Sequence, residues 1–128
     1  MDAALAALPP CLLHGDFHLG NLLVDPVGEF VWIDWQEVGS AHGPEDLAFL
    51  CQRAEAVGLT PPRDAMLTTY AAARGISDDA VLRHAFVAAE LQLLLLAWPE
   101  YLGFIDNAAR TRLSTRLNSL LEAWKANV

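Results

Sequence analysis

Two short apolar runs separated by a turn sequence constrain the fold of this chain more than any other feature. Leu22–Val24 has the composition of a strand, residues 25–29 read Asp-Pro-Val-Gly-Glu and predict a turn, and Phe30–Trp35 is a β-branched and aromatic run. The pattern predicts a small β-hairpin with polar groups at both outer ends. In such a hairpin Asn21 and Asp34 lie at the same end of two paired strands, so we expect their side chains to converge.

The pattern becomes helical after this hairpin. Gly43-Pro44-Glu45-Asp46 is typical of a helix start, with proline in the first turn and acids beside the positive end of the helix dipole. Residues 1–10 read as the frayed end of a further helix. The predicted fold class is therefore α+β and mainly helical, a hairpin followed by four helices at 43–57, 63–74, 78–98 and 107–125, with Gly58, Gly75 and Pro99 ending the first three.

The chain has room for one domain with one modest core, because it has 128 residues. We divide residues 1–128 into a hairpin part, 11–36, and a helical part, 43–128. Apolar residues make up 54% of the chain, above the usual share of about 45–50%. This surplus predicts an apolar surface that faces another lobe or a second copy.

Charge and cysteine usage limit the partners of the chain. The net charge is −8, with eight basic and sixteen acidic residues, which argues against nucleic acid and favours cationic small molecules. Cys11 and Cys51 form no disulfide framework and no signal peptide precedes them, so we expect a cytoplasmic protein. The apolar block Leu91–Trp98 is far shorter than the roughly 20 residues that cross a bilayer, and it predicts a core helix rather than a membrane contact.

A polar string before the hairpin carries the residue types that phosphoryl transfer needs. Residues 14–21 read His-Gly-Asp-Phe-His-Leu-Gly-Asn. Such a reaction needs a carboxylate that orients a hydroxyl and accepts its proton, and oxygen ligands that hold magnesium against phosphates. Asp16 could be this base, Asn21 a neutral ligand and Asp34 a charged one.

Each of these acids also has a structural explanation. His-Gly-Asp is common in turns, where the Asp16 carboxylate would cap local amides. Asp34 follows apolar residues and, if buried, would need a partner such as Arg53. Asp46 on its own is a helix-start acid. The same considerations place His42 in a loop, His84 on a helix face, and the tryptophans in the core (Trp32, Trp35, Trp98 and Trp124).

The string H-G-D-x-x-x-x-N, followed by I-D-W and a helix that opens with G-P-E-D-L-A, resembles the aminoglycoside phosphotransferase and choline kinase family. The resemblance implies part of the C-terminal lobe of a protein-kinase-like fold. It also implies transfer of the γ-phosphoryl group of ATP or GTP to a hydroxyl of a small molecule, such as an aminoglycoside, choline, an amino acid or a sugar. The implied roles are catalytic base for Asp16, magnesium ligands for Asn21 and Asp34, and support of the catalytic loop for His14, His18 and Asp46.

The parts of such enzymes that bind the phosphates of the nucleotide have no counterpart in this sequence. No Gly-rich loop precedes the polar string, thirteen residues precede His14, and the one lysine is Lys125, near the C-terminus. We therefore expect the N-terminal nucleotide-binding lobe to be absent and the chain alone to lack activity. The surface that this lobe would cover is expected to be apolar and to pair two copies as a homodimer.

Two other functions remain open at this point. A metal-dependent phosphoesterase would use His14, Asp16 and His18 as ligands, since alternation would place them on one face of a strand. It needs further ligands, and only His42 and His84 are left. A non-catalytic kinase remnant that serves as an interaction module would explain the missing lobe, although it has no need of Asp16, Asn21 and Asp34.

Overall fold

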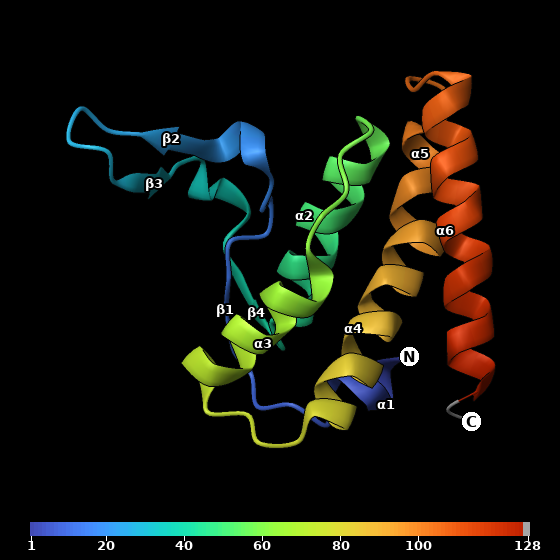
Figure 1. Cartoon of the computed structure of the whole chain (residues 1–128), viewed down its shortest axis with the longest axis horizontal. Coiled ribbons are helices and arrows are strands. Elements are labelled where there is room, and N and C mark those ends of the chain that lie inside the picture. The colour runs from blue at the N-terminus through green and yellow to red at the C-terminus, as the bar shows by residue number, and fades with distance from the viewer. Residues whose placement is uncertain (127–128) are drawn as a thin grey trace.

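The computed structural model describes residues 1–126 and is mainly helical, with two small antiparallel sheets (Figure 1). The prediction of a single hairpin was therefore incomplete, because a second sheet is present. The elements in chain order are α1 (Asp2–Leu5), β1 (Cys11–Leu13), β2 (Leu22–Val24), β3 (Phe30–Trp32), β4 (Gly39–Ala41), α2 (Pro44–Ala56), α3 (Arg63–Arg74), α4 (Asp79–Gln92), α5 (Trp98–Tyr101) and α6 (Asn107–Ala126).

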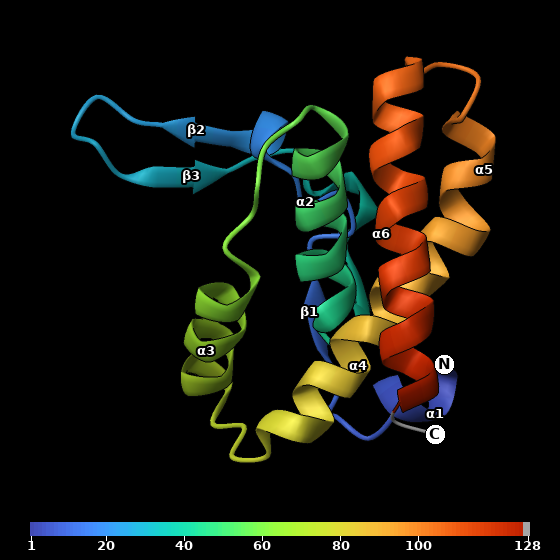
Figure 2. The ribbon, with the colours of Figure 1, turned by 45° about the vertical axis from the view of Figure 1, so that its right-hand side comes forward.

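The predicted hairpin is confirmed as β2 and β3. Leu22 pairs with Trp32, Leu23 with Val31 and Val24 with Phe30. The returning strand is shorter than predicted, since it ends at Trp32 rather than Trp35. The hairpin projects away from the helices as an arm, so much of its apolar surface is exposed (Figures 1 and 2).

The sheet that was not predicted joins β1 to β4. Cys11 pairs with Ala41 and Leu13 with Gly39, which closes the long loop that carries the hairpin. Residues 39–41 read Gly-Ser-Ala and have little strand propensity, so the pairing depends on tertiary contacts. Gly43, which follows at a φ of 105°, is required because an added Cβ would lie 1.6 Å from the hydroxyl oxygen of Tyr70.

The core forms where α4 packs against α1, α2 and α6. Three of the predicted helices, now α2, α3 and α6, have bounds within one residue of the prediction. Gly58 and Gly75 follow the ends of their helices, as the sequence predicted, and both adopt positive φ angles. The largest fully buried apolar side chains are Leu82, Leu91, Leu120, Pro44 and Cys51.

The prediction that Pro99 ends the third helix was wrong. A π-helical turn over Leu93–Ala97 follows α4, and the chain re-enters an α-helix at Trp98 with Pro99 in its first turn. Proline is tolerated there because first-turn N–H groups have no partner within their own helix. By length and composition alone, the continuous segment Asp79–Tyr101 could cross a membrane, although 44% of its most apolar window is buried inside the protein.

A buried carboxylate in this segment ties four helices together. Glu90 on α4 is fully buried and pairs with Arg63 of α3 and with Arg116 of α6. Arg63 also pairs with Glu55 of α2 at 2.9 Å. Because each of these charges is paired with another helix of the bundle, the arrangement favours a core helix over a lipid-facing one.

Candidate active site

The polar string runs as a loop from the end of β1 to the start of β2, and Asp46 in the first turn of α2 holds it in place. One carboxylate oxygen of Asp46 accepts the backbone N–H of His14 at 2.7 Å, and the other accepts the N–H of Gly15 at 3.1 Å. Burial raises the pKa of Asp46 above its ordinary value of 3.8, and these two hydrogen bonds oppose that rise. Asp46 thus fixes the backbone direction just before Asp16.

The buried ring of His14 connects this loop to the hairpin. Its Nε2 lies 2.8 Å from the carbonyl oxygen of Ile33, and its Nδ1 accepts the backbone N–H of Asp16 at 3.3 Å. A carbonyl can only accept, so Nε2 carries the hydrogen and the ring is in one defined neutral tautomer. His14 therefore ties Asp16 to the residue that precedes Asp34.

Gly15 lies so close to the backbone of Glu37 that any residue with a side chain at position 15 would force the backbone to shift. Gly15 has a φ of 86°, and an added Cβ would lie 2.0 Å from the carbonyl oxygen of Glu37. Two pairs of aromatic rings pack together between this loop and the hairpin. The ring centroids of Phe17 and Trp32 are 3.9 Å apart, and those of His14 and Trp35 are 4.5 Å apart.

Asp16 is held by the side chain of Asn21. The Asn21 amide nitrogen donates to the backbone oxygen of Asp16 and to its carboxylate Oδ2, both at 2.9 Å. Asn21 itself is buried, whereas the Asp16 side chain stays 35% exposed. Asp16 is thus oriented by a fixed amide and remains accessible to a ligand.

Asp34 differs from the prediction in its environment. It is exposed rather than buried, and its only described side-chain partner is Gln36, which donates to Oδ1. The alternative of a pair with Arg53 is not found among residues 1–126. Asp34 is the one described non-glycine residue with a positive φ, at 64°, a conformation that costs roughly 1 kcal/mol or more.

Asn21 and Asp34 do lie at the same end of the hairpin, as predicted. The backbone N–H of Ile33 donates to the carbonyl oxygen of Asn21 at 2.9 Å, one step beyond the Leu22–Trp32 pair. The amide nitrogen of Asn21 is used by Asp16, so its side-chain oxygen is left to serve a ligand. An amide oxygen and a carboxylate oxygen fit magnesium, which binds through few protein groups when phosphates complete its shell.

His18 lies beside Asp16 rather than on a shared strand face with it. Its Nδ1 accepts the N–H of Gly20 at 3.0 Å, and its Nε2 lies 3.5 Å from the Asp16 carboxylate. In the part of the chain that the structure describes, no group of three or more His, Cys, Asp or Glu side chains could hold a metal. The phosphoesterase alternative therefore finds no support in the described residues.

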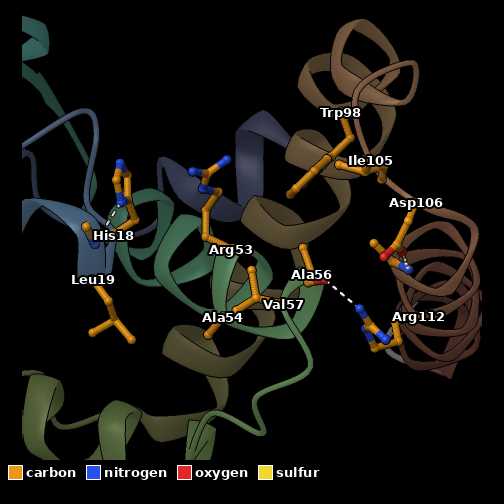
Figure 3. A pocket seen from close by; sticks show the side chains of 12 residues that line it. His18, Leu19, Arg53, Ala54, Ala56, Val57, Trp98, Ile105, Asp106 and Arg112 are labelled. Atoms are coloured by element: carbon orange, nitrogen blue, oxygen red, sulfur yellow. Dashed lines mark hydrogen bonds between the residues drawn. The ribbon is translucent and has the colours of Figure 1, made fainter.

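Two adjoining cavities open beside Asp16 and His18. The smaller, about 230 Å³, is lined by Asp16, His18 and Arg53 together with aromatic and apolar side chains of the helices. The larger, about 490 Å³, extends towards the start of α6 (Figure 3). Sequence reasoning missed the helical residues that line them, namely Phe49, Arg53, Trp98, Tyr101 and Arg112. No sequence signal marked these positions, because their meeting depends on how α2, α5 and α6 pack.

The expectation that all four tryptophans belong to the core holds only in part. Trp98 is buried beside both cavities, and its indole N–H donates to the side-chain oxygen of Gln52 at 2.8 Å. Trp35 is instead exposed, and its indole N–H donates to the Trp32 carbonyl at 2.9 Å. Trp124 is partly buried and stacks on His84.

The comparisons with known proteins bear on the same region. The model of the phosphotransferase enzyme family matches residues 1–85 of the 128. The match includes every candidate residue from His14 to Asp46. A search of the curated proteins found no match.

Proposed function

The chain belongs to the phosphotransferase enzyme family, and from this premise we propose that its site serves transfer of the γ-phosphoryl group of ATP or GTP to a hydroxyl of a small molecule. The observation that carries this proposal is the double hydrogen bond of Asn21 to Asp16 at the end of the hairpin where Asp34 also lies. The proposal includes a protein-kinase-like arrangement, in which this chain corresponds to part of the C-terminal lobe.

Asp16 acts as the catalytic base in this proposal. Its carboxylate accepts the proton of the acceptor hydroxyl as the new oxygen–phosphorus bond forms and the bond to the departing nucleoside diphosphate breaks. Asn21 keeps the carboxylate in one orientation through its amide hydrogens. His14, Asp46 and His18 hold the loop so that Asp16 faces the smaller cavity.

Asn21 and Asp34 would hold the metal ion. Magnesium bound there would neutralise charge on the transferring phosphoryl group. The left-handed backbone of Asp34 is consistent with this role, because strain at a non-glycine residue concentrates at functional sites. Gln36, which donates to one Asp34 oxygen, would leave the other for the ion.

No lysine among the described residues lines the cavities of the site, where it could bind the phosphates. The sole lysine, Lys125, pairs with Glu122 on α6 at 2.8 Å. We therefore propose that the 128 residues bind the magnesium nucleotide but turn over poorly without a cation supplied from elsewhere. Binding, rather than turnover, is the informative measurement.

A calorimetric titration with ATP and magnesium tests the proposal. We expect the chain to bind the magnesium nucleotide and Asp34→Ala to weaken binding by more than about tenfold, since the variant loses the charged ligand. Asp16→Asn should bind as the original chain does. Asp64→Ala on α3 is the matched control, because it removes an equal charge from an exposed position. Equal binding by Asp34→Ala and the control would contradict the assignment.

One observation favours the second candidate, a non-catalytic interaction module. The hairpin arm exposes Leu23, Val24, Phe30 and Val31, which is unusual for a surface that only solvent contacts. The same titration separates the two functions, because an interaction module does not require nucleotide binding that depends on Asp34.

A further inference from the structure

Arg53 stands between the two cavities of the candidate site. Both cavities are lined by Arg53, His18 and Trp98, so they adjoin at these residues; together we call them the groove, and Asp16 lines its smaller part. Figure 3 shows the Arg53 side chain rising from α2 between His18 on one side and Trp98 on the other. Asp16 and Arg53 line the same cavity, so one ligand in it can contact both side chains.

The guanidinium of Arg53 belongs to an exposed residue and has no carboxylate partner among the described residues. Its one recorded contact is with the Phe49 ring, whose centroid lies 6.0 Å away. The other arginines near the groove and the core already have ion-pair or hydrogen-bond partners. Arg63 and Arg116 pair with Glu90, and Arg112 donates to the backbone oxygens of Glu55 and Ala56.

Neither acidic residue of the groove, Asp16 or Asp106, forms an ion pair with Arg53. Asp106 accepts the backbone N–H of Ala109 at 2.7 Å and caps α6. Asp16 is engaged with Asn21 and lies beside His18. An anionic ligand in this groove would supply the carboxylate partner that Arg53 lacks.

The remaining walls of the smaller cavity are apolar or aromatic. They are Phe49, Leu93, Ala97, Trp98 and Tyr101. Such walls bind an apolar body through area and stacking, while a few polar groups set its orientation.

We propose that the acceptor is a hydroxy acid: an apolar or aromatic body with its hydroxyl at Asp16 and its carboxylate on the Arg53 guanidinium. The inference rests on the proposed function for the role of Asp16, and it revises the cationic substrate that net charge alone favoured. Arg53 is a specificity-determining residue here, because a planar guanidinium binds a carboxylate through two parallel hydrogen bonds.

The test compares three ligands of one shape and different charge. They are 3-hydroxy-3-phenylpropanoate, its neutral primary amide, and the cationic 3-amino-1-phenylpropan-1-ol, each titrated into the full chain while the indole N–H resonance of Trp98 is followed. We expect the acid to bind about tenfold more tightly than the amide, as suits a charge-assisted hydrogen bond, and the amine to bind least. Arg53→Gln should remove the preference for the acid, and Arg53→Lys should retain part of it.

Arg110→Gln is the matched control, since Arg110 borders a different cavity. The inference is overturned if the three ligands bind equally, if the amine binds best, if none binds at millimolar concentration, or if Arg53→Gln leaves the preference unchanged. Loss of magnesium–ATP binding in Arg53→Gln with unchanged acid binding would assign the guanidinium to the nucleotide and also overturn it. Selection of the acid by a chain that binds no magnesium nucleotide would instead uphold this inference and reject the proposed function.

Discussion

The carboxylate of Asp46 accepts the backbone N–H of His14 at 2.7 Å, across 32 positions of the sequence. Its other oxygen accepts the N–H of Gly15. Asp46→Ala leaves both amides without this acceptor, and we expect it to lower the free energy of unfolding by about 2–3 kcal/mol. Urea denaturation measures this change. Glu37→Ala, an exposed acid beside the same loop, is the control and should change stability by less than about 0.5 kcal/mol.

The same carboxyl group predicts a pH dependence of stability. Burial raises the pKa of Asp46 above its ordinary value of 3.8, so the folded chain holds this proton more tightly than the unfolded chain does. The part of the stability that comes from this tighter proton binding is therefore fully present below pH 3.8 and is lost as the pH rises through the raised pKa, while the hydrogen bonds of the carboxylate remain. Stability measured against pH should show this decline, and Asp46→Asn should remove it. A carboxyl titration by NMR that places the pKa of Asp46 at or below 3.8 would contradict the prediction.

Among the substitutions proposed for this chain, we expect Glu90→Ala to lower the free energy of unfolding the most. The Glu90 carboxylate is fully buried and pairs with Arg63 and Arg116. Glu90→Ala leaves two guanidinium groups short of a partner, and we expect it to cost roughly 3–5 kcal/mol. Glu122→Ala is the control, because the pair of Glu122 with Lys125 is exposed and worth less than about 1 kcal/mol. Similar urea midpoints for the two variants would show that Glu90 is not a structural centre.

Local signals explain which parts of the fold could be predicted. Pro44 in a first turn and Gly58 and Gly75 at helix ends act through their own backbone, and Asp106 before α6 acts through its side chain on a nearby N–H. The helices they bound were predicted within one residue. The β1–β4 sheet was missed because Gly39–Ala41 pairs only through tertiary contacts. The π-helical turn before Pro99 was missed because a run of leucines has no period to interpret.

Some features of the candidate site could likewise be predicted from the sequence, and others could not. Hairpin geometry alone was enough to predict that Asn21 and Asp34 share one end of the strands, and the register confirms it. The exposure of Asp34 was not predicted, because it depends on the hairpin standing clear of the helices. Arg53 was considered only as a partner for Asp34. Its place in the groove depends on how α2 packs beside the loop, which no local pattern reports.

The two cysteines are expected to react very differently with alkylating reagents. Cys51 is fully buried, and burial raises its pKa to about 11, so its reactive thiolate is scarce and shielded at neutral pH. Cys11 on β1 is only partly buried, 4.0 Å from the hydroxyl of Tyr70. Iodoacetamide followed by mass spectrometry should modify Cys11 in the folded chain and Cys51 only under denaturing conditions. Equal labelling of both thiols in the native chain would be inconsistent with this packing.

The exposed apolar side chains and unpaired strand edges of the hairpin arm predict that the chain associates with a second copy of itself. Val24 and Phe30 are cross-strand partners, and both are mostly exposed, at 63% and 72%. Among the described residues β2 and β3 form a two-stranded sheet, so each leaves one edge unpaired and open to another copy. We expect sedimentation velocity to show a concentration-dependent dimer.

A pair of phenylalanine variants locates the dimer contact. Burying a phenylalanine side chain contributes about 1.5–3 kcal/mol. Phe30→Thr should therefore raise the dissociation constant of the dimer by about tenfold or more. Threonine keeps the strand propensity of the position, which separates lost contact from lost folding. Phe104→Thr is the matched control, because Phe104 is 88% exposed and lies in the turn before α6, away from the arm. A chain that sediments with the mass of one copy at every concentration rejects association, and an equal effect of both variants rejects the arm as its site.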